Sequence, residues 1–387
     1  MARMTVPIYQ GLSTADFTRP ATVPSSRAFP FTAAHRLPFY RARNAIYYLM
    51  AALVERRPGL TVLAPDYNSG NEILAIRAAG AQIRYYPVNR RMQLDPDVVE
   101  QLCVQHNPDV LYVIHYVGWP QPMPALVRLC ERRGMRLVED CALSLLSDMD
   151  GRPLGSFGDW SVFCLYKTLP LPNGALLVQN TAARIEALEH VPLRQAGLAS
   201  IAGRTAELVV QRMRGHSGRI GAVLQAAKRG MGMAAGALAV RRANVGDIGF
   251  NIDEVDLAMS RLSAHLLDRL DAADIRDRRV RNYRLLDAQL DSGVTRVFPH
   301  LPDGVCPLFL PILVPDKPAA ARALQQCGID ALEFWNESMD SGLEMSADAR
   351  FLRAHVLELP IHQDLTLPQI AYMARQVSAL LSLRVAA

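Results

Sequence analysis

Hydrophobic positions between residues 41 and 180 fall into two alternating patterns. In 41–57, apolar residues stand at positions 45, 46, 49, 50 and 53, a spacing typical of an amphipathic helix. Short, nearly continuous apolar runs separate such stretches and are typical of strands buried on both faces. Strands are predicted at 60–65, 82–88, 110–118, 135–140, 161–166 and 175–180, and helices at 41–57, 71–81, 95–105 and 123–134.

This alternation predicts an α/β fold in which a large, mostly parallel sheet is sandwiched between helices. In such sheets, ligands bind at the carboxyl ends of the strands. Asp140 ends one predicted strand, and Lys167 directly follows another. We therefore expect the functional site where these two strand ends meet.

The rest of the chain has a different pattern of hydrophobic and polar positions. Residues 1–38 are rich in Pro, Thr and Ser and lack periodicity, whereas 251–290 reads as one long amphipathic helix. A strand at 307–314 and helices at 317–328 and 368–383 complete the pattern. The predicted division is an N-terminal arm (1–38), a large domain (39–265) and a small C-terminal α+β domain (266–387).

A basic segment at 191–244 interrupts the α/β pattern with nine Arg or Lys residues and one acidic residue. Three interpretations remain open: a solvated helical excursion or dimer contact, a wall that binds a phosphorylated or nucleotide-linked substrate, and a helix at a membrane surface. Membrane contact is the least favoured of the three. Arg212, Arg214 and Arg219 are the candidates for binding a phosphorylated substrate.

Composition excludes several classes of protein. The 387-residue chain is 50% hydrophobic, enough for a large core, and its net charge of +5 is mild. No apolar run predicts a membrane span, the N-terminus lacks a signal-peptide pattern, and no nucleic-acid-binding motif appears. The six cysteines have no metal-ligand spacing and read as buried thiols, so we predict a cytoplasmic protein without a metal site.

Lys167 and Asp140 suggest a specific chemistry. A lysine in an apolar run is costly as an ammonium ion and suits an amine that bonds an aldehyde. Pyridoxal 5'-phosphate (PLP) supplies such an aldehyde and needs a carboxylate on its ring nitrogen, as Asp140 could provide. Taken singly, a strand-end aspartate such as Asp140 is more often a cap, and a lysine such as Lys167 is more often a residue whose amine reaches solvent.

A phosphate cradle is predicted where Ala42, Arg43 and Asn44 open a helix, because free N–H groups and the helix dipole favour an anion there. His115 and Trp119 follow a predicted strand and could line the pocket, with core packing as the equal alternative.

The order of these motifs over residues 38–380 resembles that of the DegT/StrS-type aminotransferases, PLP enzymes of fold type I that often act on nucleotide-linked keto-sugars. The resemblance is carried by "VLAPDYNSGNEILAIRAAGAQIRYYPV" at 62–88, "HYVGWPQPM" at 115–123, "VEDCA" at 138–142, "DGRPLGSFGDWSVFCLYK" at 150–167, "GFNIDEVDLAMSRL" at 249–262 and "LELPIHQDLT" at 357–366. It implies a fold type I transferase with a PLP-binding large domain.

The resemblance also implies roles for individual residues. Lys167 would form the Schiff base (internal aldimine) and carry the proton, and Asp140 would bind the pyridinium nitrogen. Ala42 and Arg43 fall on phosphate-binding positions, and Cys164 stands where a serine usually contacts the phosphate. Asn251 matches an asparagine that reaches the neighbouring subunit's PLP, which implies a homodimer with shared active sites.

Two departures from the family pattern stand near the site. Lys167 arrives two residues earlier than the family's spacing, and Leu169 occupies the usual position. Ser69 stands where the family commonly stacks an aromatic ring on PLP, so Tyr67 and His115 become the candidates for that contact.

Three functions are weighed on this basis. The first is an aminotransferase that moves an amino group from an amino acid, with glutamate as the expected donor, to a keto or aldehyde acceptor, such as a nucleotide-linked keto-sugar. The second is another PLP reaction, such as dehydration or decarboxylation. The third is a binding or regulatory subunit that has kept the fold without turnover.

Overall fold

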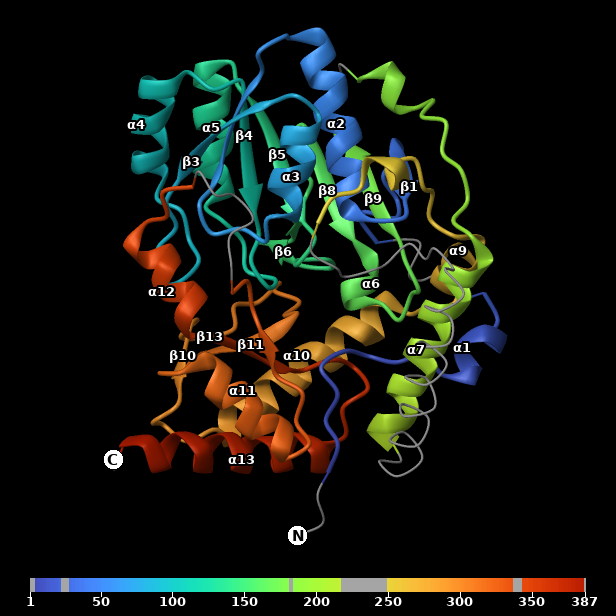
Figure 1. Cartoon of the computed structure of the whole chain (residues 1–387), viewed down its shortest axis with the longest axis vertical. Helices are drawn as coiled ribbons and strands as arrows, with labels where there is room; N and C mark the ends of the chain where they lie inside the picture. Colours follow the sequence, from blue (N-terminus) through green and yellow to red (C-terminus); the bar gives the residue numbers. More distant parts are fainter. Residues whose placement is uncertain (1–3, 22–27, 181–183, 217–248, 337–342, 386–387) are drawn as a thin grey trace.

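The computed structural model describes residues 4–21, 28–180, 184–216, 249–336 and 343–385. A seven-stranded sheet forms its upper part (Figure 1). The strand order is β1 (Arg36–Phe39), β9 (Ala175–Gln179), β8 (Trp160–Cys164), β5 (Arg136–Cys141), β4 (Val110–Ile114), β2 (Thr61–Pro65) and β3 (Gln82–Tyr86). Among these seven, only β9 runs against the others, because it pairs antiparallel with both β8 and β1. The predicted mostly parallel sheet is confirmed.

Helices connect the parallel strands as the periodicity predicted. They are α2 (Ala42–Arg56), α3 (Asn71–Ala78), α4 (Pro96–His106) and α5 (Met123–Arg133). The Asp95 side chain caps α4 by accepting the Asp97 N–H at 2.9 Å, and α5 ends at Gly134 with φ 65°. The apolar positions of α2 are buried, and this helix packs on β8 and β9.

The strand predicted at 161–166 ends earlier than its apolar pattern suggested. β8 stops at Cys164, and the chain turns at once into α6 (Leu165–Thr168), a helix of one turn. The Leu169 N–H closes this turn on the Leu165 carbonyl at 2.8 Å. Lys167 therefore lies on a helical turn just beyond the strand end.

A second, antiparallel sheet forms the lower part of the molecule (Figure 1). Its order is β10 (Thr295–Arg296), β11 (Phe309–Leu313), β13 (Val356–Pro360) and β12 (Leu332–Glu333). The predicted strand at 307–314 and helices at 317–328 and 368–383 correspond to β11, α11 (Lys317–Gln326) and α13 (Leu367–Val385). The sequence analysis missed β13 and the preceding α12 (Ala347–His355).

The single long helix predicted at 251–290 is wrong. The chain instead forms η3 (Ile252–Glu254), α9 (Arg261–Leu267) and α10 (Ala272–Gln289). The Ser260 hydroxyl accepts the Ser263 N–H at 3.1 Å, and the Asp271 carboxylate accepts the Ala273 N–H at 3.0 Å. These two caps start new helices that the continuous apolar periodicity concealed.

The N-terminal segment is tied to the lower part of the molecule before it reaches α1 (Thr14–Thr18) and β1. Val6 exchanges backbone hydrogen bonds with Gly328 and Asp330, each 2.9 Å long. The Gly11 N–H bonds the Asp364 carboxylate at 2.8 Å, and the Leu12 N–H bonds the Leu208 carbonyl of α7 (Leu198–His216) at 3.1 Å. Residues 4–12 thus run beside the small sheet and α7 (Figure 1).

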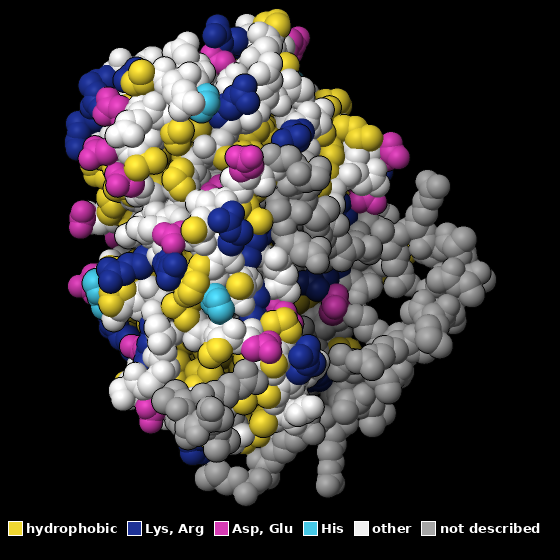
Figure 2. Space-filling view, turned by 60° about the vertical axis from the view of Figure 1, so that its left-hand side comes forward, with side chains coloured by type: hydrophobic (Ala, Val, Ile, Leu, Met, Phe, Trp, Pro, Cys, Tyr) yellow, Lys and Arg dark blue, Asp and Glu magenta, His cyan; other side chains and the backbone are white. Residues whose placement is uncertain are grey.

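The remaining short elements are η2 (Glu186–Leu188) and the pair β6 (Asp148–Met149) and β7 (Arg152–Pro153). None of the helices in the described ranges is long and apolar enough to cross a membrane. On the face in Figure 2, basic and acidic side chains are interspersed over the described surface. The predicted domain boundaries at 38/39 and 265/266 stay predictions.

Candidate active site

A cavity of about 680 Å³ lies where the carboxyl ends of β5 and β8 approach the small sheet. Asp140 and Lys167 line its upper wall, and Phe309 and Leu332 line the opposite wall. This volume is ordinary for a small-molecule site. The two strand ends that the sequence singled out therefore meet at one cavity.

Lys167 enters this cavity from α6 and is partly buried. No hydrogen bond or ion pair joins its Nζ atom to a residue in the described part of the chain. An amine without such a partner is available to bond a ligand.

Asp140 is held in place by two hydrogen bonds at the end of β5. The Tyr112 hydroxyl donates to Oδ2 at 2.6 Å, and the Ala142 N–H donates to Oδ1 at 2.8 Å. Burial raises the pKa of Asp140 above its ordinary value, while these hydrogen bonds and the charge of Lys167 act in the opposite direction. A cationic ligand atom would stabilise the ionised carboxylate further.

The N-terminus of α2 forms another part of the wall, through Ala42 and Arg43. The first N–H groups of a helix have no partner within it, so they can bind an anion. Asn44 is used differently: its amide donates to the Glu254 carbonyl at 2.8 Å, and Arg43 bonds the Gly249 carbonyl. The structure thus places Ala42 and Arg43 at the cavity and uses Asn44 to hold residues 249–254.

Cys164 also reaches the cavity, from the last position of β8. Its thiol is buried, and burial raises its pKa. The neighbouring Tyr166 lines the same wall, and its hydroxyl is paired with this thiol. A neutral thiol at this position can serve as a weak hydrogen-bond donor.

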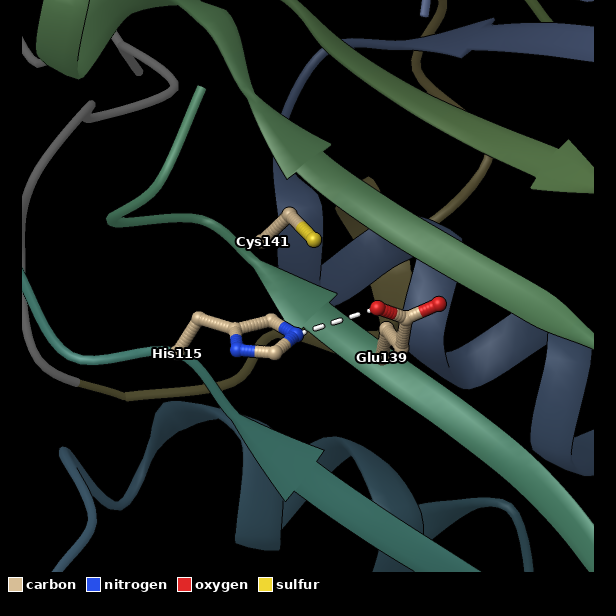
Figure 3. A group of neighbouring side chains, drawn as sticks. All are labelled: His115, Glu139 and Cys141. Carbon is tan, nitrogen blue, oxygen red and sulfur yellow. Dashed lines mark hydrogen bonds and ion pairs between the residues drawn. The ribbon is translucent and has the colours of Figure 1, made fainter. Parts of the chain in front are cut away.

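His115 lies away from the cavity in a fully buried group with Glu139 and Cys141 (Figure 3). The Gln121 N–H donates to Nδ1 at 3.2 Å, so the ring proton is on Nε2, which donates to Glu139 at 3.0 Å. Glu139 also accepts backbone N–H groups of Gly155, Phe157 and Gly158 at 2.6–2.9 Å. Because Nδ1 of His115 already accepts the Gln121 N–H, the ring has no lone pair free for a metal. His115 instead holds the backbone at Gln121 in place.

Tyr67 and Trp119, two further predicted site residues, do not line the cavity either. Tyr67 is fully buried behind Trp335, with ring centroids 5.0 Å apart. Trp119 stacks on Phe298 with centroids 4.1 Å apart, in the core. The structure supports a packing role for Trp119, and it places neither Tyr67 nor His115 where a ring could stack on a ligand in the cavity.

Two of the three arginines chosen from the basic segment are engaged elsewhere. Arg212 pairs with Asp364, and Arg214 approaches Asp330 at 3.4 Å. Neither lines the cavity, and Arg219 lies outside the described residues. A run of basic residues in the sequence does not reveal which of their side chains already form ion pairs in the folded protein.

Another residue of the same basic segment, Arg204 of α7, does line the cavity. It pairs with Glu207 at 2.8 Å. Asn251 is exposed and caps η3 by accepting the Asp253 N–H at 3.1 Å, outside the cavity wall. Its predicted role toward a neighbouring subunit stays a prediction.

The sequence analysis missed several residues at the cavity, above all Tyr9 and Glu72. Tyr9 comes from the aperiodic arm, where no pattern could single it out. Glu72 accepts the Ser69 N–H at 2.7 Å. Its pKa is raised mainly by burial and, to a smaller extent, by the charge of the nearby Asp140. Burial raises the pKa of Asp140 as well, so the direction of the shift does not distinguish the two carboxyl groups.

Comparison with known proteins agrees with this geometry. The DegT/DnrJ/EryC1/StrS aminotransferase family matches residues 32–378. One similar protein is a UDP-N-acetyl-3-dehydro-alpha-D-glucosamine 3-aminotransferase of Acidithiobacillus ferrooxidans, 27% identical over 36% of this chain. Another is a dTDP-3-amino-3,4,6-trideoxy-alpha-D-glucose transaminase of Micromonospora megalomicea, 32% identical over 38% of this chain. Each match covers only 38% of the relative's own length.

Likeness to solved structures extends further along the chain. A putative sugar aminotransferase of Streptococcus pneumoniae in its PLP form has a TM-score of 0.69 and 14% identity, covering 98% of this chain and 99% of its own. At this identity the likeness shows the fold, and it confirms the predicted fold type I architecture.

Proposed function

Because the chain belongs to the DegT/DnrJ/EryC1/StrS aminotransferase family, we propose that it is a PLP-dependent aminotransferase. It would transfer an amino group from an amino acid such as glutamate to a keto or aldehyde acceptor. The observation that carries this proposal is the meeting of Lys167, Asp140 and the N-terminus of α2 around one cavity.

The residues at the cavity fit PLP group by group. The amine of Lys167 suits the aldehyde, and the carboxylate of Asp140 suits the ring nitrogen. The N-terminus of α2 at Ala42 and Arg43, together with the Cys164 thiol at the same cavity, suits the phosphate. When bound, PLP would accept electrons from the substrate's α-carbon.

The chain's own residues would then bind, orient and move a proton. Lys167 would hold the cofactor and, once its amine is free, carry the proton from the substrate's α-carbon. Asp140, fixed by Tyr112 and Ala142, would keep the ring nitrogen protonated. Glu72 lies beside it, and the charge of Asp140 adds to burial in raising the pKa of Glu72.

For the acceptor, we propose a nucleotide-linked keto-sugar. The relatives named above act on sugars linked to nucleoside diphosphates. Two guanidinium groups, Arg43 and Arg204, stand at the cavity and could attract a diphosphate, and Trp335 offers an aromatic face for a sugar ring.

The test is spectroscopic. Purified protein with PLP should show the visible absorbance band of an imine, which borohydride reduces, and peptide mapping should find the cofactor on Lys167. Adding glutamate should bleach the band, and a keto-sugar nucleotide should restore it. The Lys167→Ala variant should show none of these changes.

The outcomes also separate the alternatives. A band that forms but does not respond to any amino donor would favour another PLP reaction, and the absence of any adduct on Lys167 would favour a binding subunit. The shared homodimer and the cytoplasmic location belong to the same proposal and await their own measurements.

A further inference from the structure

The turn that carries Lys167 is too short to satisfy its own carbonyl groups. Within α6, only the Leu165 carbonyl is bonded by the turn, through the Leu169 N–H at 2.8 Å. In a longer helix, the carbonyls of residues 166–168 would accept N–H groups from the next turn. Buried carbonyls without partners are costly, so these groups need donors from elsewhere.

Gln10 of the N-terminal arm supplies the first donor. Its Nε2 atom lies 3.3 Å from the Tyr166 carbonyl, 3.3 Å from that of Lys167 and 3.1 Å from that of Leu169. The side chain is buried, with 1% of its surface exposed. A residue far away in the sequence therefore contacts the backbone on both sides of the lysine.

Arg279 of α10 and Gln363, which follows β13, supply the other donors. Arg279 Nη2 bonds the Gln10 Oε1 atom at 3.0 Å and the Thr168 carbonyl at 3.2 Å. Its Nη1 atom bonds the Leu308 carbonyl at 3.1 Å, and Gln363 Nε2 reaches the Thr168 carbonyl at 3.3 Å. Three segments of the chain thus converge on one turn.

Arg279 is unusual because it is fully buried without an ion pair to any carboxylate in the described ranges. Burying a charge with only neutral acceptors is expensive, and desolvation lowers the pKa of Arg279 to about 10. A hydrophobic side chain would serve the fold at lower cost. The arginine's contacts with the lysine turn offer a reason for its presence.

We propose that Gln10, Arg279 and Gln363 form a lysine clamp, a set of positioning residues that aims Lys167 into the cavity. The clamp rests on the proposed function and deepens it. None of the three side chains lines the cavity, so each acts through the turn. The clamp accounts for a lysine that arrives two residues early and still reaches the site.

The sharpest test uses Gln10 with a matched control. Gln211 also ties the arm down, through its Nε2 bond to the Tyr9 carbonyl at 2.8 Å, but the structure records no bond from it to the lysine turn. Gln10→Ala and Gln10→Glu both remove the Nε2 amide that donates to the lysine turn. The glutamate variant keeps an oxygen acceptor for Arg279, now as a carboxylate. Gln211→Ala removes an arm contact alone.

The first readout needs no cofactor. Hydrogen exchange of the backbone amides in 165–169 should become about tenfold faster in both Gln10 variants and stay unchanged in Gln211→Ala, since the clamp holds that turn. The second readout is the steady-state rate: kcat should fall about 10- to 100-fold in both Gln10 variants, with the acceptor KM within about twofold, because a small misplacement of a reacting group slows chemistry.

The melting temperature separates positioning from stability. The melting temperature of Gln10→Glu should be close to that of the wild type. A merely structural role for Gln10 therefore predicts normal hydrogen exchange and a normal kcat in that variant. That result would overturn the clamp. Equal effects from Gln211→Ala would overturn it as well. Failure of wild-type protein to form an adduct with PLP would count against the proposed function, whereas the exchange comparison judges the clamp by itself.

Discussion

Glu358 lies in the middle of β13, fully buried, and neither of its carboxyl oxygens has a hydrogen-bond partner in the described part of the chain. It pairs in register with Leu332 and Pro311, so it points to the same face of the small sheet as the cavity-lining Leu332 and Phe309. Desolvation raises its pKa well above the ordinary value of 4.5, and the charges of Lys167 and Lys317 only partly offset this.

This carboxyl group should make stability depend on pH. The native state retains a proton that the unfolded chain releases above pH 4.5, so native stability falls as pH rises from there through the folded-state pKa. Glu358→Gln should therefore stabilise the protein by about 1–3 kcal/mol at pH 7 and by close to nothing at pH 4. Urea unfolding at both pH values measures this.

The partly exposed Glu333 on neighbouring β12 provides the control. Glu333→Gln should change stability at neither pH by more than about 0.5 kcal/mol. An equal gain for Glu358→Gln at pH 4 and pH 7 would show that the carboxyl does not titrate as argued.

At the residue scale, sequence reasoning located the residues at strand ends that line the cavity, while their roles stay predictions. Lys167, Asp140 and Cys164 stand at such ends, and the structure gathers them with Ala42 and Arg43 around one cavity. The same reasoning gave no way to separate these from His115, which also follows a strand but has its ring nitrogens committed to Gln121 and Glu139. Whether a polar side chain is already satisfied depends on contacts distant in sequence.

At the element scale, Gly174 joins the end of β1 to the start of α6. Its N–H bonds the Tyr40 carbonyl at 3.0 Å, its carbonyl accepts the Leu165 N–H at 2.9 Å, and its φ is 136°. An added Cβ would lie 2.9 Å from the Met259 sulfur. The backbone conformation at this position therefore requires glycine, and an added Cβ would force the Met259 side chain to shift.

Gly174→Ala should destabilise the protein by about 2–3 kcal/mol, because it combines backbone strain with a steric clash. Gly59→Ala is the matched control: Gly59 has φ 81°, but nothing lies within 4 Å of an added Cβ. That variant should lose only about 1 kcal/mol. Thermal or urea unfolding measures the stability of both variants. Equal losses of stability would show that the contact with Met259 costs no free energy.

Elements with strong periodicity were predictable, and those set by caps or by pairing were not. The buried positions of α2 match its apolar spacing closely. By contrast, Ser260 and Asp271 divide what reads as one helix, and the two-residue strands β10 and β12 exist only through their pairing with neighbours. Such elements are defined by tertiary contacts, which a single local pattern does not contain.

At the scale of the whole molecule, the proposed homodimer predicts that subunits complement one another. Lys167→Ala and Asn251→Ala should each be inactive alone if Asn251 serves the neighbouring subunit's site. Random mixing of the two variants would give hybrid dimers in which one of two sites is intact, so about a quarter of wild-type activity should return.

Sedimentation should show a dimer for the wild type and for both variants. Hybrids formed by co-expression, with differently tagged subunits and purified before assay, should carry about half of wild-type activity, because one of their two sites is intact. If mixing restores no activity while dimers are present, each site is complete within one subunit, and Asn251 acts only as the cap of η3.

The lysine clamp also bears on how the protein is made. Gln10 leaves the ribosome well before Gln363, and both must be present before the Lys167 turn is held. Contacts between such distant parts of a chain form slowly, because a long loop must close first. The Lys167 turn would therefore be fixed only after residue 363 has been synthesised, in a late step that joins two distant segments of the chain.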